Sequence, residues 1–460
     1  MVFSSPIFLF VFLPLVTIIY YLIGKHYRNA WLLASSILFY AWGEPIYALV
    51  MLIIILLAYL AGMGIKFSQK KLATALFVVV SLSILFYFKY MNFSIGVLNN
   101  IFIMRLDYLK IVMPIGISFF IFQAISYVID AYRGEVKVQE SPFKLALYIA
   151  FFPQLIAGPI VKYHDIEQYI DTRNETLQDV IGGLKRFIIG LSKKVLLANV
   201  VGKVADDIFA AGVGNIDLAT AWLGAIAYTF QIFFDFSGYS DMAIGLGRIF
   251  GFRFLENFNY PYVADSITEF WHRWHISLST WFKEYVYIPL GGNRHGTLKT
   301  YRNLILVFLA TGIWHGANWT FIFWGVWHGA FLLLEKHFRF ATIKKYVVLK
   351  HIYALLVIIL GWVVFRAESL QEAFIYIKIM FGFVHNSVIP FGVGYYLVNK
   401  VIICLLCCTL FSVQLKVPNL ITKYKISLNI VGNLLLLGLL YLSTMYIAGA
   451  TYNPFIYFRF

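Results

Sequence analysis

Long uninterrupted apolar runs constrain the fold of this chain more than any other feature. IFLFVFLPLVTIIYYLI and YALVMLIIILLAYLAGMGI occupy residues 7–23 and 47–65, which is close to the roughly 20 residues that a helix needs to cross the hydrocarbon layer. Only 13% of the residues are charged and 61% are hydrophobic, whereas soluble domains carry about a quarter charged residues. The sequence therefore predicts an all-α polytopic membrane protein.

Apolar segments recur along the whole length, and some are short or broken by glycine and proline. We expect roughly eleven transmembrane helices, together with re-entrant and interfacial helices. The first run lacks a basic leading region and a small-residue cleavage site, so it is expected to stay as a membrane helix. With no internal repeat or linker, residues 1–460 are predicted to form one membrane domain. Its expected parts are scaffold helices at about 1–140, a motif block at about 150–335 and C-terminal helices at about 345–460.

The distribution of basic residues predicts the orientation. Lys25 and Arg28 follow the first apolar run, and Lys66, Lys70 and Lys71 follow the second. Basic loops face the cytoplasm, so the N-terminus is expected on the extracytoplasmic side, with two crossings or a hairpin between residues 30 and 65. Scattered basic residues argue against nucleic acid and favour membrane lipid as a partner.

The three cysteines lie together in VIICLLCCTLF as Cys404, Cys407 and Cys408. A metal site here would need thiolates, which are costly in hydrocarbon, and no histidine lies near the cysteines in the sequence. We interpret them as small apolar residues of a membrane helix, and they provide no disulfide framework.

Polar and ionisable residues are concentrated between Phe230 and Gly329. Such groups are costly at membrane depth and usually face a bundle interior or a water-filled cavity. In FFDFSGYSDMAIG, the glycine and serines suggest a helix break that lines a cavity. The alternative is that Asp235 and Asp241 pair with arginines such as Arg248 or Arg253 and only hold helices together.

A histidine pair occurs in FWHRWHISLSTW. His272 and His275 are three residues apart, so in a helix they share one face. Zinc would need a third ligand and an open position, but HExxH is absent and no carboxylate stands at ligand spacing. No metal is therefore expected.

His315, in TGIWHGANW, is the strongest catalytic candidate. A neutral imidazole accepts a proton from a hydroxyl and returns it to a leaving group near pH 7. Gly312 and Gly316 allow another backbone or a substrate to approach closely. The alternative is a hydrogen-bonded structural histidine in a helix bundle.

Five ordered segments carry a family resemblance. FFPQLIAGPIVKYHDI, FDFSGYSDMAIGLGRIFGF, FWHRWHISLSTWFKEYVYIPLGGNR, TGIWHGANWTFIFWGVWHG and the closing PFIYFRF resemble the membrane-bound O-acyltransferase family, in its bacterial branch that acetylates exported polysaccharides. The resemblance covers nearly the whole chain. It implies a fold around a transmembrane tunnel, with His315 as the essential catalytic residue and His275 as a second functional histidine.

The resemblance also implies a multi-pass protein of the bacterial inner (cytoplasmic) membrane and a cytoplasmic acyl donor, here acetyl-CoA. Basic residues would hold its phosphates, although a purely topological role is equally open for each: Lys162, Arg273, Lys283, Arg294 and Arg302. The tunnel is expected to be lined by polar and aromatic residues of the motif block: Asp235, Ser237, Tyr239, Asp241, Trp314, Asn318 and His328.

Members of this branch usually work with an exported partner that carries an esterase-like Ser/His/Asp domain, and this chain has no G-x-S-x-G elbow. The expected route passes acetyl to such an extracytoplasmic O-acetyltransferase, which modifies the glycan. The abundance of Lys, Ile, Phe, Asn and Tyr is typical of AT-rich genomes and favours peptidoglycan over the alternatives, alginate and cellulose.

Another class of function stays open at this point. In a transporter or flippase for a lipid-linked or acyl-carrying substrate, intramembrane Asp and His would act as proton relays or counter-ions. Such proteins commonly contain paired repeats with broken helices at matching positions. The polar motifs here form a single central block without a counterpart elsewhere. A purely structural assembly partner is a third reading, and the presence of both His275 and His315 argues against it.

Overall fold

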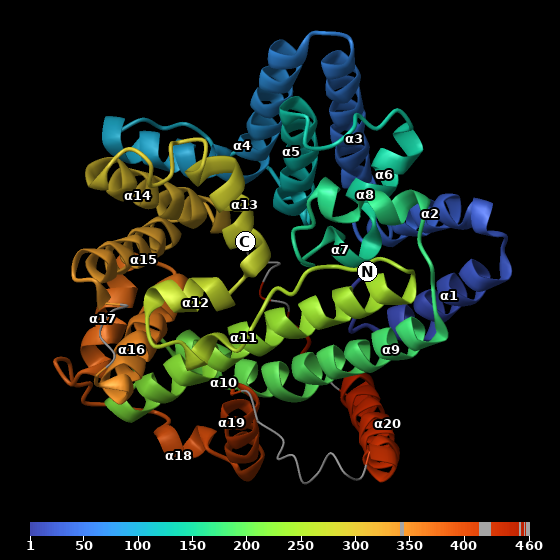
Figure 1. Cartoon of the computed structure of the whole chain (residues 1–460). Coiled ribbons are helices and arrows are strands. Elements are labelled where there is room, and N and C mark those ends of the chain that lie inside the picture. Colours follow the sequence, from blue (N-terminus) through green and yellow to red (C-terminus); the bar gives the residue numbers. More distant parts are fainter. Residues whose placement is uncertain (341–344, 414–424, 450–451, 455, 457–460) are drawn as a thin grey trace. The chain divides into compact units, whose positions relative to one another are not determined.

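The structure is a computed structural model that describes residues 1–340, 345–413, 425–449, 452–454 and 456. All regular elements in these residues are helices (Figure 1), which agrees with the predicted fold class. The described residues divide into two compact units. The first unit contains Met1–Phe187 and Ser240–Leu255, and the second contains Ile188–Tyr239 and Glu256–Phe460. Of the closing PFIYFRF motif, only Pro454 and Ile456 lie within the described residues.

The first unit is built from the N-terminal helices. Helices α3, α4 and α5 pack against one another, and α2 packs on α6 (Figure 1). Helix α9 continues into the second unit. The elements are η1 Phe8–Phe12, α1 Leu13–Leu22, η2 Lys25–Tyr27, α2 Arg28–Ala41, α3 Pro45–Lys66, α4 Lys70–Phe102, α5 Ile117–Arg133, α6 Pro142–Ala150, α7 Phe152–Leu155, α8 Tyr163–Asp171 and α9 Leu177–Ser192.

The second unit holds most of the motif block. Helix α14 packs along α15, and α15 packs on α16. Its elements are η3 Lys193–Ala198, α10 Asn199–Ala211, α11 Leu218–Ile249 (which ends in the first unit), η4 Pro261–Val263, α12 Ile267–Arg273, α13 Ile276–Phe282, η5 Lys283–Tyr287, α14 Thr297–His315, α15 Trp319–His337, α16 Val347–Arg366, α17 Leu370–Met380, α18 Val393–Tyr396, α19 Asn399–Phe411 and α20 Lys425–Gly449.

Four helices of the described part are long and apolar enough to cross a membrane. They are Pro45–Lys66, Lys70–Phe102, Val347–Arg366 and Ile430–Gly449, and two shorter apolar helices span Phe8–Leu22 and Asn399–Phe411. These helices agree with a polytopic membrane protein. The count of about eleven stays a prediction.

The expected helix break near Gly238 is absent, so this prediction was wrong. Helix α11 runs without interruption from Leu218 to Ile249. A Cβ atom on Gly238 would lie 2.7 Å from the carbonyl oxygen of Gly190. The glycine therefore serves close helix packing and does not open the helix.

Two glycines bring α14 and α15 into backbone contact. A Cβ on Gly312 would lie 2.4 Å from the carbonyl oxygen of Phe321, and one on Gly325 would lie 2.3 Å from that of Phe308. Any larger residue would push the helices apart. The close approach expected at Gly312 is thus made by the backbone of α15. It fixes the position of the WHG turn, residues 314–316, where α14 ends.

Candidate active site

His315 is the last residue of α14, and it is enclosed by aromatic rings. Its side chain is buried, with 3% of the residue exposed. Ring centroids of Trp314, Trp324 and Phe365 lie 5.0, 5.0 and 5.2 Å from that of His315, all near edge-on. The surrounding rings exclude bulk water from the imidazole, and a reactive acyl group benefits from such shielding because it is protected from hydrolysis.

His275 does not share a helical face with His272. Helix α12 ends at Arg273, and His275 stands before α13 in the left-handed conformation, with φ 44°. That conformation is uncommon for a non-glycine residue and needs support from its surroundings. His272 is exposed and His275 is fully buried. The prediction of a shared face was wrong because the chain turns sharply at Trp274 and His275.

Asn257 supplies the support for His275. Its Oδ1 accepts hydrogen bonds from the backbone N–H and the hydroxyl of Ser277, at 3.1 and 2.9 Å, and lies 3.2 Å from Nδ1 of His275. The carbonyl of Asn257 also accepts from the N–H of Ile276. One asparagine thus holds both the left-handed turn and the imidazole.

These bonds also define the tautomer of His275. Because the N–H of Ser277 can only donate, the atom it meets on Asn257 is the carbonyl oxygen, an acceptor. We therefore assign the hydrogen that points at this oxygen to Nδ1 of His275, which leaves Nε2 as the acceptor nitrogen. His275 lies in the turn outside the apolar spans, and burial lowers its pKa to about 3. The imidazole is therefore neutral near pH 7.

Trp314 joins the two histidines. Its ring centroid lies 6.1 Å from that of His275 and 5.0 Å from that of His315. Trp324 likewise joins His315 to His328, at 5.0 and 4.9 Å. The structure therefore gathers His275, Trp314, His315 and His328 in one aromatic cluster of the second unit.

Glu335 anchors the segment that leads to His275. Its carboxylate is buried and accepts from the N–H groups of Ile267 and Thr268, at 2.6 and 2.9 Å, and from the Thr268 hydroxyl at 2.6 Å. A carboxylate at a helix N-terminus compensates the unpaired N–H groups and the helix dipole. Glu335 therefore ties the start of α12 to α15, the helix that follows the WHG turn.

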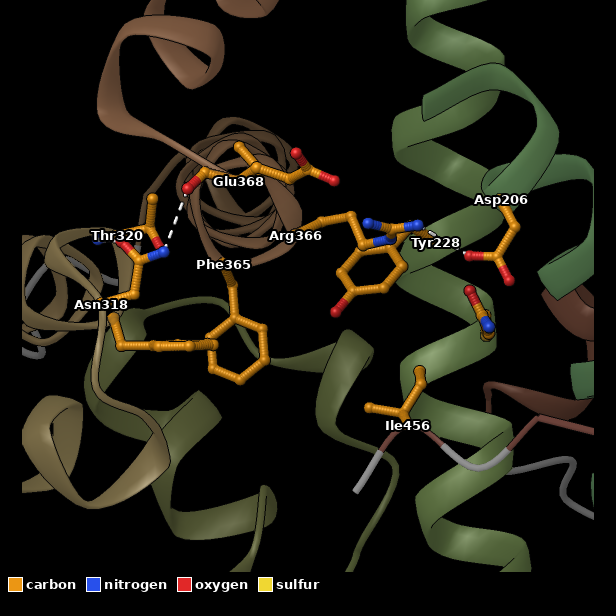
Figure 2. Close-up of a pocket in the computed structure, with 11 residues that line it drawn as sticks. Asp206, Tyr228, Asn318, Thr320, Phe365, Arg366, Glu368 and Ile456 are labelled. Atoms are coloured by element: carbon orange, nitrogen blue, oxygen red, sulfur yellow. Dashed lines mark hydrogen bonds and ion pairs between the residues drawn. The ribbon is translucent and has the colours of Figure 1, made fainter. Parts of the chain in front are cut away.

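A polar cavity of about 380 Å³ adjoins the cluster in the second unit. Figure 2 shows Asn318 and Thr320 on one side of it and Asp206, Tyr228 and Arg366 on the other. Phe365, which contacts His315, also lines this cavity. Of the predicted tunnel residues, Asn318 is thus the one that the cavity wall contains.

The two predicted aspartates are ion-paired, although not with the arginines expected from the sequence. Asp235 pairs with Lys194 at 2.8 Å, with both side chains buried, and Asp241 pairs with Arg186 at 2.7 Å. Arg248 and Arg253 instead lie 3.0 and 3.8 Å from Asp179. The partners come from elsewhere in the sequence because helix packing brings α9 and η3, the short helix that follows it, against α11.

The remaining predicted tunnel residues separate between the units. Ser237 and Tyr239 are buried on α11 within the second unit, whereas Asp241 belongs to the first. Neither Ser237 nor Tyr239 lines the polar cavity. Their role in a tunnel stays a prediction.

The predicted phosphate-binding residues lie in different settings. Lys283 and Arg294 are exposed beside the turn before α14, whereas Arg273 is engaged by Glu269 at 2.7 Å. Arg302 donates to the side chain of Asn303. Lys162 is buried and belongs to the first unit, whereas the other four belong to the second.

One group in the described residues has metal-ligand spacing, and sequence reasoning did not anticipate it. The ligand atoms of Asp130, Glu135 and His164 all lie within 4.8 Å of one another in the first unit. His164 already contacts Asp130 at 3.1 Å and Asp165 at 3.2 Å. These contacts raise the pKa of His164 to about 10, so a protonated imidazole neutralises the carboxylates.

Two supporting residues were also missed. Asn257 lies in ENFNYPY and Phe365 lies in GWVVFRAES. Asn257 precedes His275 by 18 residues, and an asparagine in a loop carries no local sign of a distant partner. Phe365 is one of 44 phenylalanines, and only the packing of α16 distinguishes it.

Comparison with known proteins shows the class and the family. A family model described as the membrane-bound O-acyltransferase family matches residues 44–377. The protein is an acyltransferase. The chain belongs to the membrane-bound O-acyltransferase family, as the motifs indicated, and the transporter and assembly-partner readings are set aside.

Three relatives illustrate the similarity. Probable alginate O-acetylase AlgI of Azotobacter vinelandii is 47% identical, over 83% of this chain and 78% of that protein. Peptidoglycan O-acetyltransferase of Helicobacter pylori is 39% identical, over 83% of this chain and 80% of that protein. Teichoic acid D-alanyltransferase of Bacillus subtilis is 31% identical, over 44% of this chain and 53% of that protein.

Proposed function

We propose that this protein transfers acetyl groups from cytoplasmic acetyl-CoA for the O-acetylation of an exported polysaccharide, with His315 as the general base. The observation that carries this proposal is the position of His315, enclosed by Trp314, Trp324 and Phe365 at the end of α14. Within this shielded site the imidazole takes the proton of the attacking hydroxyl and delivers it to the departing thiolate. The hydroxyl oxygen forms the new bond to the acetyl carbon as the carbon–sulfur bond breaks.

His275 is the second functional residue in this proposal. Its Nε2 is the acceptor nitrogen, and the ring of Trp314 contacts both its ring and that of His315. This arrangement supports an orienting role for His275 and leaves the proton transfer to His315. Lys283 and Arg294 are exposed and basic, so both are available to bind the phosphates of the donor.

Peptidoglycan is the proposed acceptor polysaccharide, reached through an extracytoplasmic esterase-like partner. The composition of the chain and its similarity to a peptidoglycan O-acetyltransferase support this choice. Alginate is the second candidate, because several probable alginate O-acetylases are 45–47% identical to this chain. Release of O-acetyl groups by mild base from purified cell wall and from exopolysaccharide of the same cells distinguishes the two acceptors.

The test of the catalytic assignment uses His315→Ala and His315→Gln. Both variants are expected to lose acetylation in cells, because neither side chain accepts the proton, while the purified proteins still bind acetyl-CoA. His272→Ala is the matched control, since His272 is exposed and has no assigned role. Acetylation near the wild-type level in either His315 variant would refute the assignment.

A further inference from the structure

The polar cavity beside His315 has walls that attract water. Its polar lining comes from α10, α11, the start of α15 and the end of α16, and comprises Asp206, Gln231, Asn318, Thr320, Arg366 and Glu368 (Figure 2). Arg366 Nη2 pairs with Asp206 at 2.8 Å. A cavity with several polar partners and this volume readily holds water molecules.

The polar lining offers both hydrogen-bond donors and acceptors. It combines the amide of Asn318, the carboxylates of Asp206 and Glu368 and the guanidinium of Arg366. Such groups together match a hydroxyl group, which both donates and accepts.

The charge of the wall selects against anions. Arg366 is already neutralised by Asp206, and Glu368 has no ion pair in the described part of the chain. One positive and two negative side chains leave a formal charge of 1 − 2 = −1 on the wall. The cavity therefore fits an uncharged hydroxyl compound better than a carboxylate.

The cavity lies at the end of the helices away from the basic turns. Helices α14 and α15 are joined by the short segment 316–318, so they are antiparallel, and Asn318 and Thr320 lie at this junction. Arg294 precedes α14 and Lys336 is in the last turn of α15, at the opposite end. In the orientation expected from the sequence, in which basic segments face the cytoplasm, the cavity is at the extracytoplasmic end, where an exported acceptor arrives.

Phe365 both lines this cavity and contacts His315. Its ring lines the cavity and lies 5.2 Å from the ring of His315, 5.0 Å from Trp324 and 4.8 Å from Phe321. The residue is 3% exposed. An aromatic ring in this position blocks the path of a water molecule from the polar wall to the imidazole.

We propose that the cavity is the acceptor site for an uncharged hydroxyl group, and that Phe365 is the gate that keeps cavity water from His315. An acceptor that fills the cavity displaces the ring and brings its hydroxyl to the imidazole. Water is too small to do so. Specificity for the acceptor over water, which is present at far higher concentration, therefore rests on Phe365. This inference depends on the proposed acetyl transfer.

The consequence of opening the gate is hydrolysis of the donor. The oxygen of water attacks the acetyl carbon of acetyl-CoA, the carbon–sulfur bond breaks, and a proton passes through His315 to the thiolate. The products are acetate and free coenzyme A. Hydrolysis without acceptor is thus the direct measure of a leaking gate.

The test follows coenzyme A thiol release from acetyl-CoA by the purified full-length protein without acceptor. Phe365→Ala is expected to release thiol several-fold faster than wild type, and Phe365→Leu, which keeps most of the bulk, to give an intermediate rate. Phe374→Ala is the matched control, because Phe374 is 44% exposed on α17. The double variant Phe365→Ala/His315→Ala is expected to lose the gained hydrolysis.

The outcomes separate this inference from the proposed function. Hydrolysis at the wild-type rate in folded Phe365→Ala or Phe365→Leu, with wild-type acetylation intact, overturns the gate and leaves the acetyltransferase. Gained hydrolysis that persists without His315 also overturns the gate. Absence of any His315-dependent acetyl transfer in the wild-type protein overturns the proposed function itself.

Discussion

Asn257 Oδ1 lies 3.2 Å from His275 Nδ1 and also accepts the N–H of Ser277, so one amide oxygen fixes an imidazole and the turn that bears it. The backbone of His275 is left-handed, and such a conformation persists where its surroundings determine it. The hydrogen bonds leave Nε2 of a neutral ring as its acceptor. Asn257 is therefore a positioning residue for His275.

Asn257→Ala is expected to lower kcat roughly tenfold to hundredfold. Loss of a buried hydrogen bond costs about 1–3 kcal/mol, and each 1.4 kcal/mol corresponds to about tenfold in rate. Asn257→Asp keeps the acceptor oxygen and should recover part of the activity. Asn259→Ala, at an exposed position two residues away, is the control. Unchanged kcat in a folded Asn257→Ala protein would contradict the positioning role.

The two histidines are expected to differ in the size of their effects. His315→Ala should lose about 100- to 10,000-fold in acetyl transfer, the usual contribution of general base catalysis, and His275→Ala should retain more activity. Single-turnover rates of the purified variants measure the difference. Equal losses would indicate one coupled unit, and a greater loss at His275 would exchange the two roles.

The buried Lys194–Asp235 pair is expected to contribute strongly to stability. Asp235→Asn leaves an acceptor for the N–H of Ile456 but removes the charge opposite Lys194. Loss of one partner of a buried pair costs about 3–5 kcal/mol. Asp207→Asn breaks the exposed Lys203–Asp207 pair on α10 and should cost about 0.3–0.5 kcal/mol. Thermal unfolding in detergent compares the variants, and similar shifts for both would show that the buried charge is not essential.

His164 is expected to make stability depend on pH. Asp130 and Asp165 raise its pKa to about 10, whereas the unfolded value is about 6.5. The stabilisation is therefore fully present below about pH 6.5 and is lost as the pH rises through 10. The difference in unfolding temperature between wild type and His164→Gln should shrink over this range. His26→Gln, an exposed histidine in the same unit, is the control, and a pH-independent difference for His164→Gln would argue against the charged imidazole.

The proposed orientation predicts cytoplasmic tags at two positions. Reporter tags after Lys25 and after Lys70 should both be protected from an impermeant reagent added to intact cells, because basic segments face the cytoplasm. A tag at the N-terminus should be labelled. Labelling after Lys25 or after Lys70 would reverse or refute this topology.

The sequence by itself determined the class of the protein and indicated His315 as its candidate catalytic residue. Apolar runs of membrane length have few alternatives to helices, because a backbone in hydrocarbon must satisfy its own hydrogen bonds. His315 stands out because it lies in TGIWHGANW, one of the segments that resemble the family. The bend at His275 was missed because it depends on Asn257, 18 residues earlier.

Tertiary packing decided which partners the predicted residues have. Lys194 reaches Asp235 because η3 is held beside α11, and Arg248 is engaged by Asp179 in the first unit. Phe365 comes to His315 from α16, 50 residues further along the chain. Such partners follow from the way helices pack and not from local pattern, since the side-chain periodicity of a helix indicates only which face is buried.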